Sequence, residues 1–205
     1  MLFPHQVPVS ESALLVVDVQ DSFKVGPRWA RRSNPDLETN LGALIEAYRA
    51  AGRPVIYVLH SDPDPGFETT SPHYRLMDFL SPAADEPVIH KTTRNAFTST
   101  PLLPMLLERG VRRVAVTGIS TEQCCETTAR VAADLGLAVD FVLDATCTFP
   151  IEGLDGDELG TDDIIQRTVF CLRNRFARIT SSAELAAELA AELAGAGETA
   201  LASAA

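Results

Sequence analysis

Three reactive side chains, Asp18, Lys91 and Cys124, each follow a short apolar run of the sequence. A carboxylate, an ammonium and a thiol can serve as base, electrostatic stabiliser and nucleophile when a fold brings them together. Cys124 comes after the apolar run 114–117 and a glycine, where a helix is expected to begin. The dipole and the free backbone N–H groups of a helix N-terminus favour a thiolate and can hold an oxyanion. These residues predict a hydrolase with a cysteine nucleophile.

The elements that must position these side chains are strands and helices in alternation. Short runs rich in β-branched residues alternate with helical patterns, which is typical of a parallel sheet covered on both faces. The predicted strands are 13–18, 55–59, 88–90, 113–117, 138–143 and 177–180. The predicted helices are 35–51, 102–107, 121–135, 162–174 and 181–193, with loops at 61–72 and 144–160. Active sites in such sheets lie at the carboxyl ends of the strands, where all three side chains are expected.

Length and composition favour one catalytic domain and exclude several other classes of protein. The chain has 205 residues, and we expect a single domain at 1–194 followed by a frayed, Ala-rich tail at 195–205. A formal charge of −11 argues against a nucleic-acid partner. The sequence contains neither a signal-peptide pattern nor the ~20 apolar residues of a membrane span. The four cysteines lack metal-site spacing. Without a signal-peptide pattern we expect a cytoplasmic location, where thiols are normally reduced.

Three blocks of sequence carry a resemblance to a known family. They read Asp18-Val-Gln-Asp-Ser-Phe23, Lys91-Thr-Thr-Arg-Asn-Ala-Phe97 and Gly118-Ile-Ser-Thr-Glu-Gln-Cys124. In this order they resemble the signature blocks of the isochorismatase-like cysteine hydrolases. The resemblance extends from about residue 11 to residue 185, and Asp144-Ala145 after the next strand also matches the family.

The resemblance implies a fold and a role for each reactive residue. The fold would be a Rossmann-like three-layer α/β/α sandwich with a central, mostly parallel sheet. Cys124 would be the nucleophile, Asp18 the general base and acid, and Lys91 the third member of the triad. A cis peptide would join Ile119 to Ser120, and the N–H groups of Ser120 and Cys124 would form the oxyanion hole. Members of this family suggest a homodimer or homotetramer.

The expected reaction is hydrolysis of a C–N bond in a small molecule through a thioester on Cys124. Family members that hydrolyse isochorismate lack this cysteine, so its presence favours amide substrates. The same triad could instead hydrolyse an ester or another reactive carbonyl. A catalytically silent binding or scaffold protein is a further alternative, and redox sensing by Cys124 and Cys125 ranks below it, because adjacent cysteines form a strained disulfide.

A metal and other cofactors are not expected. Nicotinamidases of this family bind a metal through an Asp-x-His motif and a second His after the second strand. Here that segment reads His60-Ser-Asp-Pro-Asp-Pro-Gly66, and His73 follows without the required spacing. Nicotinamide is therefore not the favoured substrate. We interpret His60 and His90 as structural.

Candidate substrate-binding residues lie near the three blocks, and each also has a packing interpretation. They are Gln20, Phe23, Trp29, Phe97 and Glu122. Trp29 belongs to the basic segment 27–32, which is either a solvated loop with a packed indole or a wall over the active site. In the second case Arg28, Arg31 or Arg32 would meet a substrate anion. We interpret Cys125, Cys147 and Cys171 as packing residues.

Overall fold

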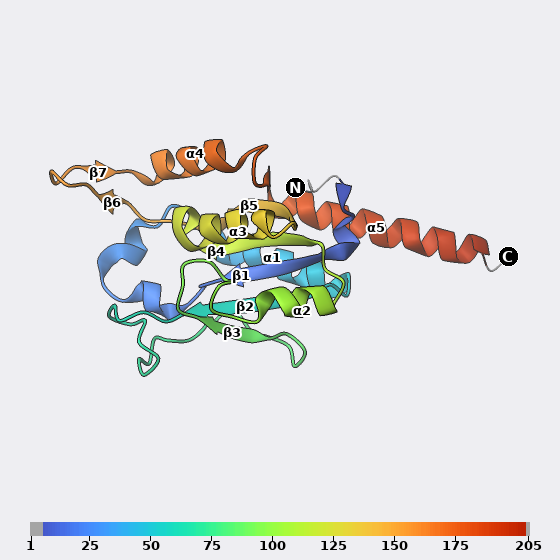
Figure 1. The fold of residues 1–205 in the computed structure, drawn as a ribbon, viewed down its shortest axis with the longest axis horizontal. Helices are drawn as coiled ribbons and strands as arrows, with labels where there is room; N and C mark the ends of the chain where they lie inside the picture. Colours follow the sequence, from blue (N-terminus) through green and yellow to red (C-terminus); the bar gives the residue numbers. More distant parts are fainter. Residues whose placement is uncertain (1–5, 204–205) are drawn as a thin grey trace.

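The centre of the fold is a parallel sheet of six strands (Figure 1). The computed structural model describes the backbone of residues 6–203 and the side chains of residues 6–195. The strand order is β3-β2-β1-β4-β5-β8. In chain order the strands are β1 (Ser12–Val17), β2 (Val55–His60), β3 (Val88–Lys91), β4 (Arg113–Ile119), β5 (Ala138–Cys147) and β8 (Arg178–Thr180). Every residue of β1, β2 and β4 is buried, as expected for strands covered on both faces.

Helices cover both faces of the sheet and complete the three layers. Alternate side chains of β1 enter opposite cores: Leu14 and Val16 lie in one, Leu15 and Val17 in the other. The first core is closed by α1 (Leu37–Ala50) and α5 (Ser182–Ser203). The second core is closed by α2 (Leu102–Glu108), α3 (Glu126–Asp134) and α4 (Thr161–Leu172). The predicted α/β/α sandwich is therefore confirmed.

Short helical turns connect the strands to the helices near the carboxyl edge of the sheet. They are the 3₁₀ turns η3 (Asp21–Lys24) and η4 (Pro27–Arg31) and the π-helical turn η5 (Thr121–Cys125); another 3₁₀ turn, η2 (Val9–Glu11), precedes β1. Because η5 runs directly into α3, Cys124 lies inside a wide turn that precedes the regular helix. Figure 1 shows the connections from β1 and β5 meeting at this edge.

Two predicted boundaries were wrong. The segment 144–160 is not a loop throughout, because β5 continues to Cys147 and an antiparallel hairpin follows, formed by β6 (Ile151–Glu152) and β7 (Glu158–Leu159). A register shift between Val116 and Gly118 lets β5 stay paired with β4 as far as Cys147. The last helix continues to Ser203, past the expected start of the tail, since alanine and leucine favour helix. Side chains beyond residue 195 lie outside the described residues.

In the part of the chain that the structure describes, no helix has the length and apolar content needed to cross a membrane. The cytoplasmic location stays a prediction.

Candidate active site

The ends of β1, β3 and β4 place three side chains at one point on the carboxyl edge of the sheet. Asp18 follows β1, and its backbone adopts a left-handed conformation with φ of 54°. Lys91 is the last residue of β3, beside His60 at the end of β2. Cys124 reaches the same place from the turn η5 that follows β4. Parallel strands end at the same edge, so three segments far apart in sequence meet there.

The three side chains are in contact and shielded from solvent. Lys91 Nζ lies 2.8 Å from Asp18 Oδ2 and 3.4 Å from Cys124 Sγ. The same ammonium donates to the backbone oxygen of Thr93 at 3.1 Å, so each of its three N–H groups has a partner. Asp18 and Lys91 have no exposed surface, and Cys124 is 4% exposed. Asp18 Oδ1 is buried and accepts no hydrogen bond from any described residue.

Burial sets the proton affinities at this point. Burial raises the pKa of Asp18 above its ordinary value, although the Lys91 ammonium acts in the opposite direction. Burial, and next the negative charge of Asp18, raise the pKa of Cys124 to about 12, while Lys91 lowers it. The sequence analysis expected the helix N-terminus to favour a thiolate, whereas burial favours the protonated thiol in the folded protein.

The chain between β4 and η5 passes very close to β1. A cis peptide joins Ile119 to Ser120, as the family resemblance implied. Gly118 has φ of 117°, and a Cβ atom at this position would lie 1.9 Å from the backbone oxygen of Val17. Only glycine allows this approach of the two strands. The approach places Ser120 and Cys124 beside the end of β1.

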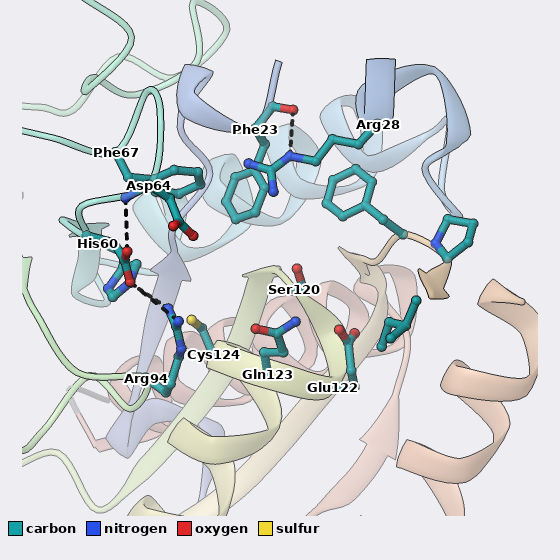
Figure 2. A pocket seen from close by; sticks show the side chains of 14 residues that line it. Phe23, Arg28, His60, Asp64, Phe67, Arg94, Ser120, Glu122, Gln123 and Cys124 are labelled. Atoms are coloured by element: carbon teal, nitrogen blue, oxygen red, sulfur yellow. Dashed lines mark hydrogen bonds and ion pairs between the residues drawn. The ribbon is translucent and has the colours of Figure 1, made fainter. Parts of the chain in front are cut away.

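A cavity of about 270 Å³ opens above Cys124 (Figure 2). This volume is slightly below the roughly 300–1,000 Å³ of typical ligand pockets, so the site suits a small molecule. The triad contributes Cys124 to the cavity surface, and connecting segments contribute the walls. The other lining residues are Phe23, Arg28, His60, Asp62, Asp64, Phe67, Arg94, Ser120, Glu122, Gln123, Phe149, Pro150 and Ile151.

One wall is an aromatic cluster around a guanidinium group. The rings of Phe23 and Phe67 meet edge to face at 5.0 Å, and Phe23 stacks on Phe149 at 5.7 Å. The Arg28 guanidinium carbon lies 4.9, 5.3 and 5.7 Å from the centres of the Phe23, Phe67 and Phe149 rings. Figure 2 shows Arg28 and Phe23 on one side of the cavity and Ser120 and Cys124 on the other. Phe67 and Phe149 are site residues that the sequence analysis missed.

A second wall consists of His60, Arg94 and Asp62. Arg94 Nη1 lies 2.7 Å from His60 Nε2, and Arg94 Nη2 lies 3.4 Å from Asp62 Oδ2. Burial, and next the Lys91 charge, lower the pKa of His60, so the ring is neutral and accepts the Arg94 hydrogen bond. His60 was interpreted as structural, yet it lines the cavity. Arg94 was also missed, although it belongs to the block that begins at Lys91, which was the available signal.

The structure divides the candidate substrate-binding residues into two groups. Phe23 and Glu122 line the cavity, and their role in binding stays a prediction. Gln20, Trp29 and Phe97 do not line it. Gln20 is fully buried and holds β2 in place, donating to the backbone oxygen of His60 at 3.1 Å and accepting from its N–H at 2.8 Å. Phe97 belongs to the second core, and Trp29 packs against the Phe149 ring.

The basic segment 27–32 contributes a single arginine to the cavity. Arg28 lines it, whereas Arg31 forms an ion pair with Glu158 of β7 at 2.7 Å. Arg32 lies over the Trp29 ring, with its guanidinium carbon 4.8 Å from the ring centre. The packed indole agrees with the first interpretation of this segment, and contact of Arg28 with a substrate anion stays a prediction.

Within the described residues, no group of three His, Cys, Asp or Glu side chains is placed to hold a metal ion. The expectation of a site without metal or cofactor stays a prediction. Cys125 and Cys147 are buried and Cys171 is half-buried, which agrees with packing roles.

A family model, related sequences and solved structures all relate this chain to the same protein family. Residues 12–184 match the model of the isochorismatase domain. The isochorismatase family protein YrdC of Bacillus subtilis is 28% identical over 177 residues, which cover 85% of this chain and 94% of YrdC. Nicotinamidase 3 of Arabidopsis thaliana is 32% identical, over 67% of this chain and 74% of its own. A solved isochorismatase-family structure from Chromobacterium violaceum is 29% identical with a TM-score of 0.81, covering 88% of this chain and 94% of its own.

Proposed function

Because the chain belongs to the isochorismatase family, we propose that it hydrolyses the C–N bond of a small amide through a thioester on Cys124. The observation that carries this proposal is the contact of Lys91 with both Asp18 and Cys124 at the base of the cavity. A relative, nicotinamidase 3 of Arabidopsis thaliana, bears an amidase name. That name describes the relative, and it supports amide chemistry here without naming the substrate.

Attack on the substrate begins with a proton transfer from Cys124 to Asp18. The thiol is protonated at rest, so the thiolate forms only as the base removes its proton. Burial raises the pKa of Asp18, which brings this carboxylate closer to the proton affinity that a general base needs near neutral pH. Lys91 lies 3.4 Å from the sulfur and lowers the pKa of the thiol, so it stabilises the thiolate as it appears.

The carbonyl oxygen of the substrate takes negative charge as sulfur attacks its carbon. Ser120 and Cys124 both line the cavity, and their backbone N–H groups are the proposed donors to this oxyanion. Asp18 then gives its proton to the departing nitrogen, the C–N bond breaks, and a thioester remains on Cys124. In the second half, the oxygen of a water molecule attacks the thioester carbon while Asp18 takes a proton from that water. The C–S bond breaks, the acid leaves, and Asp18 returns the proton to the Cys124 sulfur. The sum is amide plus water giving acid plus amine or ammonia.

Two alternatives use the same site differently. An ester or another reactive carbonyl would follow the same path with an alcohol or other leaving group in place of the amine. A silent binding protein would need no triad, and a buried ion pair is often no more stable than well-packed apolar residues. The fully buried Asp18–Lys91 pair beside a thiol is therefore better explained by chemistry than by stability.

The test is acyl-enzyme trapping with a panel of small amides and the matching esters. We expect acid-quenched protein to carry the acyl mass on the peptide that contains Cys124. Cys124→Ala should carry none and should lose turnover by at least about 10³-fold, as for other covalent nucleophiles. Cys171→Ala, which changes a half-buried cysteine outside the cavity, is the matched control and should behave like the unmodified protein.

Each outcome separates one interpretation from the others. Acylation by esters with no turnover of any amide would favour the ester hydrolase. Near-normal turnover in Cys124→Ala would overturn the thioester mechanism. A native protein that neither acylates nor turns over any member of the panel would favour the binding or scaffold protein.

A further inference from the structure

We infer that the substrate of this site carries a carboxylate or similar oxyanion, and that Arg28 binds this group on the wall opposite Cys124. The inference rests on the proposed function, because it names the class of amide that the site accepts. It starts from a cation that faces the cavity, is held rigidly and leaves most of its hydrogen-bonding capacity unused.

The aromatic cluster surrounds the Arg28 guanidinium. The rings of Phe23, Phe67 and Phe149 lie 4.9 to 5.7 Å from the guanidinium carbon. Contacts of this kind restrain the group through cation–π attraction while its N–H groups, which lie in the guanidinium plane, stay available. A restrained guanidinium loses little conformational entropy when it binds a planar anion.

The N–H groups of Arg28 are nearly unused within the protein. Nε donates to the backbone oxygen of Phe23 at 3.4 Å, and Nη2 donates to that of Ser22 at 3.5 Å, both long for hydrogen bonds. Within residues 6–195 Nη1 makes no hydrogen bond, and Arg28 takes part in no ion pair. Arg94, on the opposite wall, is already engaged with His60 and Asp62. Arg28 is thus the lining cation that is free to take a carboxylate through two parallel N–H···O bonds.

The charges around the cavity set the direction in which the anion must point. Glu122 lies near Cys124, where it accepts a hydrogen bond from Thr148 Oγ1. Its negative charge disfavours an anion at that end. Asp64 lines the cavity and attracts Arg28, but its own side chain is exposed, so solvent screens it. The favoured pose places the scissile amide at Cys124 and the anion against Arg28 and the phenylalanine rings.

The cavity volume limits the distance between the two ends of the substrate. At about 270 Å³ the cavity accepts a short molecule, so the amide and the anion are separated by a few carbon atoms. Short ω-amides of dicarboxylic acids have this shape. Malonamate, succinamate and glutaramate form a series that differs by one methylene at each step, and their diamides supply matched compounds without the negative charge.

The experiment measures binding and turnover separately. Binding of each monoamide and its diamide to Cys124→Ala is measured by titration calorimetry, and turnover is measured with Cys124 present. We expect at least one monoamide to bind at least tenfold more tightly than its diamide. Arg28→Met keeps an apolar chain between the rings and should remove about 10- to 100-fold of that preference, the usual range for a charge-assisted pair. Arg28→Lys should retain part of it, since it keeps the charge and loses the paired geometry.

Arg32→Met is the matched control, because Arg32 also lies over an aromatic ring but does not line the cavity. It should leave the preference unchanged. Equal binding of every monoamide and its diamide, or a preference that survives Arg28→Met, would overturn the inference. Arg28-dependent binding of a monoamide with no hydrolysis would support the inference and count against the proposed function. Hydrolysis of amides with no preference for the anion would do the reverse.

Discussion

Lys91 Nζ lies 2.8 Å from Asp18 Oδ2, and neither side chain has any surface exposed to solvent. Removing two charges from water costs several kcal/mol for each charge. Their mutual attraction offsets this cost only when the geometry is good and further hydrogen bonds are present. Lys91 has those further partners in Thr93 and Cys124, whereas Asp18 Oδ1 has none among the described residues. Burial raises the pKa of the Asp18 carboxylate although Lys91 and Cys124 act in the opposite direction, which suits it to accept a proton.

The raised pKa of Asp18 gives a prediction for the pH dependence of kcat/KM. The base must be ionised to accept the Cys124 proton, so activity should fall as pH falls through the Asp18 pKa. Because burial raises that pKa, the midpoint of the acid limb should lie above the ordinary aspartate value of about 3.9. Rates measured against pH on an amide substrate test this, with circular dichroism to show that the fold persists. A midpoint at or below the ordinary value would contradict it.

Alkylation of Cys124 should respond to its neighbours in opposite directions. With a thiol pKa of about 12, iodoacetamide at pH 8 should label Cys124 at least about 100-fold more slowly than a free cysteine. Asp18→Asn removes the charge that raises this pKa, so labelling should become faster while hydrolysis is lost. Lys91→Met should make labelling slower still. Peptide mapping, with Cys171 as internal standard, measures each rate. Faster labelling in Lys91→Met than in Asp18→Asn would contradict the electrostatic assignment.

Gly118 should tolerate no side chain. Alanine there would place Cβ 1.9 Å from the Val17 oxygen at a φ of 117°, so two backbones would have to separate. We expect Gly118→Ala to lose about 3 kcal/mol or more of unfolding free energy, measured by urea denaturation. Gly110→Ala is the matched control, because its φ is also positive at 68° and the added Cβ meets nothing within 4 Å. That change should cost about 1 kcal/mol, and equal losses in both variants would exclude the close approach as the cause.

Asp140 should be the main polar contributor to stability away from the site. It is fully buried on β5 and accepts from Arg113 Nε at 2.6 Å and from Arg178 Nε at 2.7 Å. Asp140→Ala would leave the buried Arg113 charge with only the more exposed Glu188 as a carboxylate partner, so we expect a loss of about 3–5 kcal/mol by urea denaturation. Glu11→Ala, which removes the half-buried partner of the exposed Arg112, should cost at most about 1 kcal/mol. Losses of similar size in the two variants would contradict the role assigned to burial.

The sequence was most informative where a reactive residue directly follows an apolar run. Asp18 and Lys91 lie at strand ends, and the sheet brings these ends together independently of the conformation of the loops. The contact of these residues with Cys124 could therefore be anticipated, and so could the layers of the fold. Their catalytic roles stay proposals, as does the expectation of a homodimer or homotetramer.

The sequence was least informative where position depends on contacts between distant segments. Phe67 and Phe149 become neighbours of Phe23 only after the loops that carry them have folded over the sheet edge. The Cys124 pKa could not be predicted either, because helix position is a local property and burial is a property of the whole fold. The extension of β5 depends on a register shift, which has no local sequence signal.

The separation between the triad and the cavity walls bears on how this fold acquires new substrates. Two of the reacting side chains are fixed to strand ends, whereas much of the cavity wall is supplied by the connecting segments at 23–28, 62–67 and 149–151. Mutation of a wall segment leaves the Asp18–Lys91 pair and the sheet intact. Selection can therefore change substrate preference without disrupting the arrangement of the reacting side chains. A lineage with this arrangement can acquire new substrates through mutations in its connecting segments, while substitutions of Gly118 are eliminated by selection.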